Sequence, residues 1–287
     1  MPPSKPVDLS PDNQDILEAW RLMFERECVA EIASLSGLEG YVYGFELDHG
    51  LIESDPVLSY HFHTSPANTL EFGTQVLSEK FTAAGITPRP NIRVMNLHPR
   101  YLKRVDELRM RDRNDVVMLD VKIEDITHPH GWLKKAIYEC RDCKTVTHID
   151  QRRARERDSP RVCRICLEKA FEGIETHGMP MSMFYPRPNF KMLNEICKYE
   201  DIQGFSMRQI TYDGEHHLIN CSTKNEISGV VTDDMVGELN ASSYARVNGV
   251  LRVDPLPTRN FAKDTRRLLS LDVFSIEPLP IEEAGQS

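Results

Sequence analysis

The chain has 287 residues, a formal net charge of -9 at pH 7, 40% apolar residues and 28% charged residues. This length allows two domains, or three small subdomains, each with its own core, and the composition is that of a soluble globular protein. No apolar run approaches the roughly 18 residues that favour a membrane span, and the N-terminus lacks the apolar region of a signal peptide. We therefore expect no membrane partner and no secretion, and the acidic balance argues against a protein coated in nucleic acid.

The segment before residue 100 is expected to be mainly helical. Residues 10–12, Ser-Pro-Asp, form a good helix start, because an N-cap hydroxyl, a proline and an acid follow one another there. Gly37 is the expected stop of the apolar pattern that begins at this point. Further helices are predicted at 55–62 and 65–85, with a short strand at 41–47.

A basic connection follows, and the apolar period then changes from helical spacing to alternation. Every second residue is apolar between 117 and 123, and the same pattern recurs in 244–253 and 266–276. We expect the alternate positions in these strands to be polar or less buried. Several short strands, interrupted by a cysteine-rich insertion, predict a small β-barrel.

Four of the seven cysteines form two Cys-x-x-Cys pairs, Cys140 with Cys143 and Cys163 with Cys166. Each such turn aims two thiolates at one point, and two turns complete a tetrahedron around zinc with Zn–S bonds of about 2.3 Å. Because four ligands leave no open position, the sequence predicts a structural Zn²⁺. Buried cysteines without a metal and redox pairs are the weaker alternatives. The odd cysteine count indicates a reducing compartment rather than a disulfide framework.

Two basic segments are candidates for contact with a polyanion. From His130 to Ala170 there are 11 Lys/Arg and 6 Asp/Glu residues, a local charge of +5, although a solvated loop with acidic neighbours is an alternative explanation. The loop between the last two strands is the second candidate, because an extended basic hairpin can follow a phosphate backbone. The first segment carries Arg152, Arg153, Arg155, Arg157, Arg161 and Arg164, and the second carries Arg259, Lys263, Arg266 and Arg267.

No residue pattern indicates catalysis by this chain. The sequence lacks the G-x-x-x-x-G-K-[ST] loop that cradles nucleotide phosphates and the G-x-S-x-G turn that carries a nucleophilic serine. The ten histidines are more typical of surface and capping roles than of a second metal site. We therefore predict no catalytic residues.

The order of the motifs is recognisable as a whole. A strand runs into "AIYECRDC", a second Cys-x-x-Cys follows, and then come "YEDIQGFSMRQI", "VVTDDMVGELN" and "ARVNGVLRV". This order resembles the N-terminal region of the minichromosome maintenance (MCM) replicative helicases, most closely the archaeal form. The residues at matching places are Asp201, Gln203, Arg208, Gln209, Asp233, Asp234, Val247 and Gly249.

The resemblance implies an α+β subunit with a helical bundle and a four-cysteine zinc module inserted in an OB-fold β-barrel. Residues 1–112 would form the helical subdomain with its basic connection, and residues 113–138 and 173–280 would form the barrel with its basic hairpin. Residues 139–172 would form the zinc module, and residues 281–287 would lead to an ATPase domain that is missing from this sequence.

The resemblance also implies partners. Six copies, or two rings of six, would encircle single- or double-stranded DNA during replication, with Arg259, Lys263, Arg266 and Arg267 facing it. The arginines of the zinc module would contact DNA or a second ring. The parent protein would be an ATP-dependent DNA helicase, cytoplasmic in an archaeon and nuclear in a eukaryote.

The sequence departs from the family pattern at three places. Lys122 stands where the first barrel strand of the family usually has glycine. His128, His130 and Trp132 stand where the family usually carries arginines that contribute to single-strand binding. Residues 241–245, "ASSYA", replace a Gly-Asp pair.

Two other functions compete with a helicase region. One is a stand-alone zinc-ribbon and OB protein that binds nucleic acid and regulates replication, transcription or translation without an ATPase. The other is a structural scaffold without DNA affinity. A downstream nucleotide-binding domain in the natural reading frame favours the helicase, and salt-dependent DNA binding excludes the scaffold.

Overall fold

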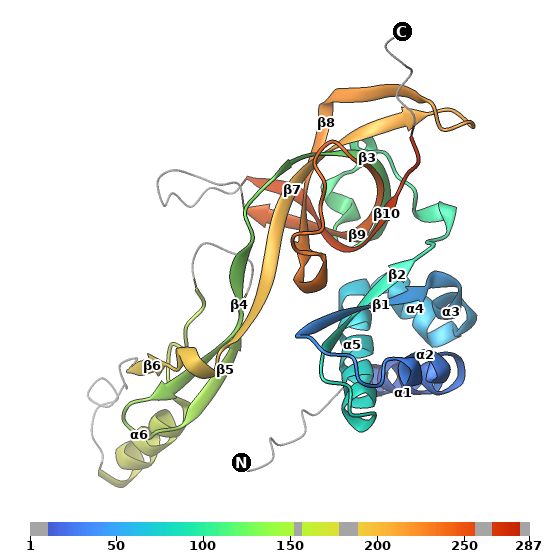
Figure 1. Ribbon diagram of the computed structural model, residues 1–287. Helices are drawn as coiled ribbons and strands as arrows, with labels where there is room; N and C mark the ends of the chain where they lie inside the picture. Colours follow the sequence, from blue (N-terminus) through green and yellow to red (C-terminus); the bar gives the residue numbers. More distant parts are fainter. Residues whose placement is uncertain (1–10, 152–156, 178–188, 256–265, 282–287) are drawn as a thin grey trace. The chain divides into compact units, whose positions relative to one another are not determined.

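The computed structural model describes residues 11–151, 157–177, 189–255 and 266–281 (Figure 1). Helices come first in the chain, and the strands of a β-barrel follow. A module that carries the cysteine pairs lies between the first two barrel strands in the sequence. This order is the one that the motifs predict.

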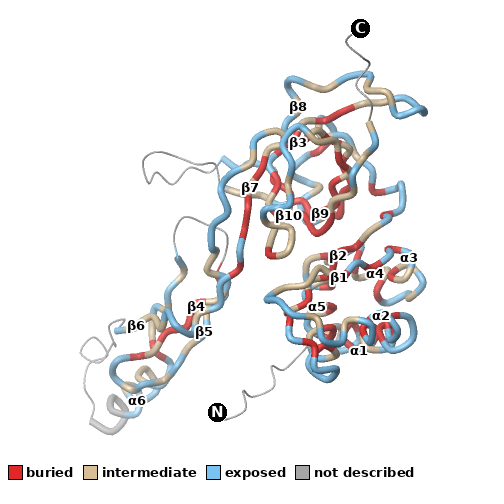
Figure 2. Tube along the Cα trace, in the orientation of Figure 1, coloured by how far each residue is buried: buried red, intermediate tan, exposed pale blue. Residues whose placement is uncertain are grey.

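Buried residues lie mainly in the helices, in the strand pair β1 and β2, and along the barrel strands (Figure 2). They form two large clusters of apolar residues, one centred on the helices and one inside the barrel. Apolar burial of this kind is the main favourable contribution to folding.

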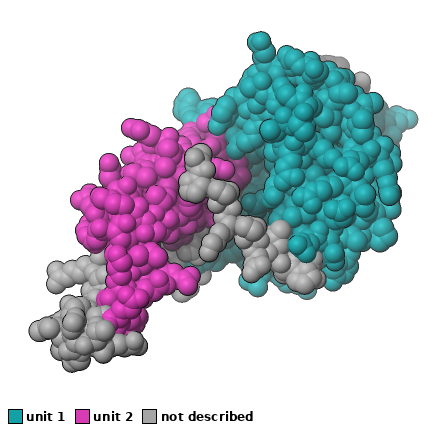
Figure 3. All heavy atoms as spheres, turned by 90° about the horizontal axis from the view of Figure 1, so that it is seen from below, with its two compact units in different colours: residues 1–129, 203–287 teal, residues 130–202 magenta. Residues whose placement is uncertain are grey.

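The chain divides into two compact units (Figure 3). Unit 1 contains residues 1–129 and 203–287, and unit 2 contains residues 130–202. Both apolar clusters consist entirely of unit 1 residues. The two units therefore differ in what stabilises them.

The helical part of unit 1 consists of five helices and a pair of parallel strands. The helices predicted at 55–62 and 65–85 and the strand predicted at 41–47 are confirmed. The helical segment expected to stop at Gly37 ends at Ser34, shortly before that glycine, and it is also broken at Cys28, whose Sγ lies in the core 4.0 Å from Met23 Sδ. The bounds are α1 Pro11–Glu27, α2 Val29–Ser34, β1 Val42–Asp48, α3 His49–Ser54, α4 Pro56–Thr64, α5 Pro66–Ala83 and β2 Arg89–Met95.

Local sequence sets the starts of these helices. Asp48 caps α3 by accepting a 2.7 Å hydrogen bond from the Gly50 N–H, and Asp55 caps α4 by accepting from Val57 and Leu58. Such side-chain caps satisfy N–H groups that have no partner within the helix. The starts of α3 and α4 are therefore encoded within a few residues of each helix.

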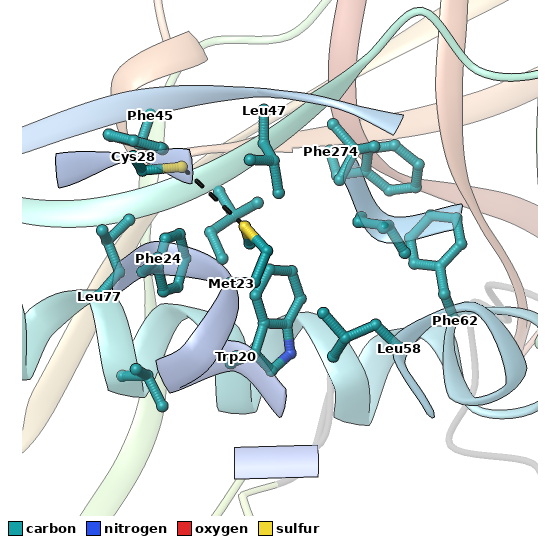
Figure 4. Packing of buried hydrophobic residues seen from close by; sticks show 14 of the residues in the cluster. Trp20, Met23, Phe24, Cys28, Phe45, Leu47, Leu58, Phe62, Leu77 and Phe274 are labelled. Carbon is teal, nitrogen blue, oxygen red and sulfur yellow. Dashed lines mark hydrogen bonds between the residues drawn. The ribbon is translucent and has the colours of Figure 1, made fainter. Parts of the chain in front are cut away.

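The core of the helical part is built around Trp20 (Figure 4). Its ring stacks on Phe24 with 5.3 Å between centroids, and its Nε1–H donates a 2.9 Å hydrogen bond to the Thr69 carbonyl. A Cβ added at Gly73 would lie 2.7 Å from the indole, so only glycine lets α5 approach this closely. The indole is thus both packed and hydrogen-bonded, as buried tryptophans usually are.

The barrel of unit 1 is a ring of five strands. Strand β3 pairs with both β9 and β7, β9 pairs with β10, and β10 runs parallel to β8. In chain order the strands follow one another around the ring as first, second, third, fifth and fourth, which is the Greek-key topology of the OB-fold. The bounds are β3 Val116–Ile126, β7 Lys198–Tyr212, β8 Leu218–Thr232, β9 Tyr244–Pro255 and β10 Arg267–Pro278.

Parts of β3 and β9 are buried on both faces, which corrects the expected alternation there. Val117 and Leu119 point into the barrel, as predicted, but Val116 and Met118 belong to the core of the helical part. On β9, Val250 joins that helical core as well. Tertiary packing, which periodicity alone does not reveal, covers the second face.

Buried ion pairs join the helical part to the barrel. Arg93 on β2 is 6% exposed, pairs with Asp234, and donates to the Thr232 carbonyl. Arg89 pairs with Asp233, the other acid of the "DD" motif, at the start of the short helix η6, Asp233–Met235. These two acids therefore have a structural role in fixing the barrel to β2.

Unit 2 is a small sheet with one helix. Strand β4 pairs with residues 198–202 of β7 near its start, and with β5 and β6 on its two edges near its end. The β5 strand and the helix α6 were not predicted from the sequence. The bounds are β4 His130–Cys140, β5 Val146–Asp150, α6 Arg164–His177 and β6 Phe190–Met192.

Candidate metal centre and nucleic-acid interface

The four predicted cysteines meet at one point in unit 2. Cys140 ends β4, Cys143 lies in the following turn, Cys163 precedes α6, and Cys166 lies in its first turn. The Sγ–Sγ distance is 3.7 Å between Cys140 and Cys166 and 3.3 Å between Cys143 and Cys163. All four sulfurs lie within 4.8 Å of one another.

Backbone hydrogen bonds shape the first cysteine turn. The N–H of Cys140 donates to the Thr145 carbonyl and the N–H of Lys144 donates to the Cys140 carbonyl, both at 2.9 Å. Lys144 has a φ of 64°, a left-handed conformation that closes the turn tightly. On the opposite side, the first turn of α6 brings Cys166 beside Cys163. A knuckle and a helix start therefore present two thiols each.

The sulfur cluster fits a tetrahedral metal ion. A zinc ion with Zn–S bonds of about 2.3 Å requires sulfurs roughly 3.8 Å apart, close to the spacing of these thiols. Cys140 and Cys163 are buried and the other two cysteines are half-buried, so a bound ion would be shielded from water. The four sulfurs would fill every position of a tetrahedron, and the metal would hold the module together rather than bind a substrate.

Interactions within the cluster shift the pKa values of its thiols in opposite directions. Hydrogen bonding with Thr145, whose Oγ1 lies 3.2 Å from the sulfur, lowers the pKa of Cys143 to about 6. Hydrogen bonding with Cys143, followed by burial, raises the pKa of Cys166 to about 12. Thiols this close cannot all ionise without a compensating positive charge. A divalent ion would supply that charge and would displace the protons.

The predicted arginines of the knuckle loop lie partly outside the described residues. Arg152, Arg153 and Arg155 are not described. The guanidinium of Arg157 lies 5.9 Å from the Tyr138 ring centroid, and its Nη1 lies 3.3 Å from Met192 Sδ. Arg157 therefore packs against Tyr138 and Met192 of the module. Its contact with DNA or with a second ring stays a prediction.

The predicted hairpin between β9 and β10 also lies partly outside the described residues. Arg259 and Lys263 are not described. Arg266 and Arg267 are exposed where β10 begins, and the Arg267 Nη1 donates to the Arg266 carbonyl at 2.8 Å. The two described arginines thus stand at the base of the hairpin, and its contact with DNA stays a prediction.

Several residues of the recognised motifs have structural roles. Gln203 donates to the Thr127 carbonyl at 2.9 Å and accepts from the Gly237 N–H at 2.8 Å. Gln209 accepts a 3.3 Å hydrogen bond from the Asp106 N–H. These buried amides tie loops to the barrel strand β7.

Sequence reasoning missed a charged row on the outside of the barrel. Lys122 on β3 lies directly opposite Arg208 on β7 and directly opposite Tyr244 on β9. Alternating charges at every second residue of β3, namely Asp120, Lys122 and Glu124, are the signal that could have indicated an exposed charged face.

No protein-family model and no curated protein sequence matches the chain. Within the described residues, no helix is long and apolar enough to span a lipid bilayer. The chain is similar to a crystal structure of the N-terminal domain of an archaeal MCM, with a TM-score of 0.69 and 16% sequence identity over 93% of this chain and 99% of that chain. The resemblance inferred from the motifs is therefore confirmed at the level of structure, and the chain has the fold of an archaeal MCM N-terminal domain.

Proposed function

We propose that this chain is the DNA-binding, ring-forming N-terminal region of an MCM-type replicative helicase. The observation that carries the proposal is the combination of a helical part, an OB-topology barrel and a four-cysteine module inserted between the first two barrel strands. The structural likeness extends over nearly the whole chain rather than over the barrel alone. The chain itself would be non-catalytic, and an ATPase domain elsewhere in the parent protein would supply helicase activity.

We assign Zn²⁺ to the cysteine cluster of unit 2. The thiolate donor set and the sulfur spacing favour zinc, and the ion would stabilise the module that carries the arginine-rich loop. Elemental analysis of chain purified without chelator should find one zinc per chain. A content clearly below one metal per chain would contradict this assignment.

DNA contact would involve the hairpin between β9 and β10. OB-folds bind oligonucleotides with the second and third strands and with the loops after the first and fourth strands. In this chain the loop after the first strand is unit 2 and the loop after the fourth is the hairpin with Arg259, Lys263, Arg266 and Arg267. Both loops are basic segments in a chain whose formal net charge is -9, which supports contact with phosphates there.

Assembly into a ring would compensate for weak binding by each subunit. In a hexamer, six modest contacts act together, because after the first contact the others form at high effective concentration. We keep the subdomain division at 1–112, 113–138 with 173–280, and 139–172 as part of this proposal. Residues 281–287 would lead to the ATPase domain.

The proposed function is tested by binding and by size. The zinc-loaded chain should bind single- and double-stranded oligonucleotides with an affinity that falls as salt rises, and light scattering should show oligomers of up to six subunits. Binding should weaken when Arg266 and Arg267 are both replaced by alanine. A chain that stays monomeric at every concentration and binds no DNA at low salt would contradict the proposal.

A stand-alone nucleic-acid-binding regulator is the second candidate. The observation that favours it is that OB topology and basic loops need no ATPase to bind nucleic acid. Salt-dependent binding by a chain that never forms oligomers would favour this candidate. The natural reading frame around these residues decides between the two, since only the helicase requires a nucleotide-binding domain.

A further inference from the structure

The two-stranded sheet of the helical part has an edge that no other strand of the described residues covers (Figure 1). Its strands β1 and β2 run parallel, and the Arg89 N–H donates a 2.9 Å hydrogen bond to the Tyr41 carbonyl. Because the direction of the backbone hydrogen bonds alternates along a strand, Tyr43, Phe45 and Leu47 also direct their backbone groups toward β2. The residues between them direct theirs toward the outer edge of β1.

The outer edge of β1 presents the N–H and C=O groups of Val42, Gly44 and Glu46. None of these groups forms a hydrogen bond with another residue in the described part of the chain. Val42 and Gly44 are half-buried, and Glu46 is exposed. A row of unpaired backbone groups at the edge of a sheet is a template for pairing with another strand.

The other sides of this sheet are covered. At the β2 edge, the Val94 carbonyl accepts a hydrogen bond from the Ser275 Oγ of β10. On one face, Phe45 packs in the helical core. On the opposite face, Asp234 of η6 lies so close that a Cβ added at Gly44 would clash with its carboxylate. The outer edge of β1 is therefore the side of the sheet that is left for a partner.

Acidic side chains flank this edge. Glu46 on β1 and Glu31 on α2 are exposed, and neither forms an ion pair with another described residue. Burial, followed by the charge of Glu46, raises the pKa of Glu31, which indicates that the two carboxylates lie near each other. Burial and then the charges of Glu31 and Glu46 also raise the pKa of Tyr43. Two neighbouring acids without a counterion favour a positively charged partner.

We propose that the outer edge of β1 is a docking site for an extended, basic segment of a partner protein, which joins the sheet as a third strand. Main-chain hydrogen bonds to Val42, Gly44 and Glu46 would supply affinity, and lysine or arginine at every second position would meet the acids. A second copy of this edge is disfavoured, because its own acids would repel those of the first. None of these residues belongs to the barrel, so the proposal does not depend on DNA binding.

The first test is the binding of fluorescently labelled hexapeptides to the full chain, measured by anisotropy. A peptide that alternates lysine and valine should bind, and a peptide that alternates glutamate and valine should not. In the Glu31→Gln/Glu46→Gln variant, affinity for the basic peptide should fall about tenfold, because two exposed ion pairs are lost. The matched control is Asp15→Asn/Glu71→Gln, which removes two exposed acids of α1 and α5 and should leave affinity unchanged.

The second test separates strand addition from attraction between charges. The basic peptide with every backbone nitrogen methylated keeps its charges but loses its donors, so it should bind at least about tenfold more weakly. The unmethylated peptide should slow amide hydrogen exchange at Val42, Gly44 and Glu46, and should leave Phe45, already bonded to β2, unchanged.

Three results would overturn the docking site. The first is equal binding of the methylated and unmethylated peptides, and the second is an unchanged affinity in Glu31→Gln/Glu46→Gln. The third is slowed exchange at the same three amides when the concentration of the chain alone is raised, because a second copy would then occupy the edge.

Discussion

Unit 1 and unit 2 are stabilised in different ways. Unit 1 contains two clusters of buried apolar residues, whereas the described part of unit 2 buries few apolar side chains, among them Ile137 and Tyr138 of β4. Unit 2 places four thiols at its centre instead. A small module with a small core needs another source of stability, and the proposed structural metal would provide it.

The sharpest way to test this contrast is Cys143→Ser. Structural zinc supplies roughly 10 kcal/mol or more of folding free energy, so removing a ligand should unfold unit 2 while the apolar cores of unit 1 persist. Hydrogen exchange should show loss of protection confined to β4, β5 and α6, and elemental analysis should show loss of the metal.

Cys221→Ser is the matched control, because Cys221 lies on β8 of unit 1, outside the sulfur cluster. This variant should keep its metal and its protection. Retention of a fully protected unit 2 in Cys143→Ser would show that the module does not depend on metal.

Trp20→Ala tests the other side of the comparison. Truncating this buried indole should lower the free energy of unfolding of unit 1 by about 3–5 kcal/mol, because it leaves a cavity and removes the bond to Thr69. Denaturant unfolding followed by circular dichroism measures the loss, with Leu22→Ala on the exposed face of α1 as control. A loss of metal binding in Trp20→Ala would show that the two units depend on each other.

Arg93→Ala asks whether unit 1 relies on apolar burial alone. The change leaves Asp234 without its buried partner, and breaking such a pair costs about 3 kcal/mol. Arg21→Ala is the control, since its exposed pairs should contribute less than about 1 kcal/mol. Equal effects in thermal unfolding would contradict a structural role for the pairing of β2 with η6.

The smallest expected effect is a pH dependence of unit 1. Burial lowers the pKa of His49 below its usual 6.5, opposed by Glu53 and Asp48 and assisted by Arg100 and His98. The unfolded chain therefore takes up this proton at a higher pH than the folded chain. The contribution of His49 to the free energy of unfolding should be constant above about pH 6.5. It should fall as the pH drops toward the lower pKa of the folded chain.

His49→Gln should reduce this decline, and His63→Gln, on the exposed side of α4, should not. Urea unfolding of unit 1 at several pH values between 7 and 5 measures both slopes. Identical slopes in the parent chain and in His49→Gln would exclude His49 as the source.

The sequence predicts a structural feature most reliably where the chemistry of that feature constrains the spacing of its residues. The two cysteine pairs define the sulfur cluster before any strand is placed, because tetrahedral coordination accepts few spacings. Proline at the first helical position defines the starts of α4 and α5 in the same local way, and Asp55 also caps α4. The helix α6 was missed because its apolar pattern overlaps the second cysteine pair.

Features that depend on distant segments were not predictable from one sequence. The burial of Met118 depends on helices that lie earlier in the chain, and the role of Asp234 depends on Arg93, 141 positions away. The Lys122 and Arg208 row appears only once the register of β3 with β7 is known. Register is a tertiary property that alternation in one strand does not specify.

The two ends of unit 2 lie side by side, since His130 pairs with Ile202 in a short antiparallel ribbon. An insertion with adjacent ends interrupts its host at little entropic cost, however long it is. Unit 2 should therefore be replaceable. A two-residue Asn-Gly turn that joins the two strands of the ribbon would let the barrel form without it. The same junction would accept a foreign domain whose ends meet at the same spacing, giving a barrel with an interchangeable attachment.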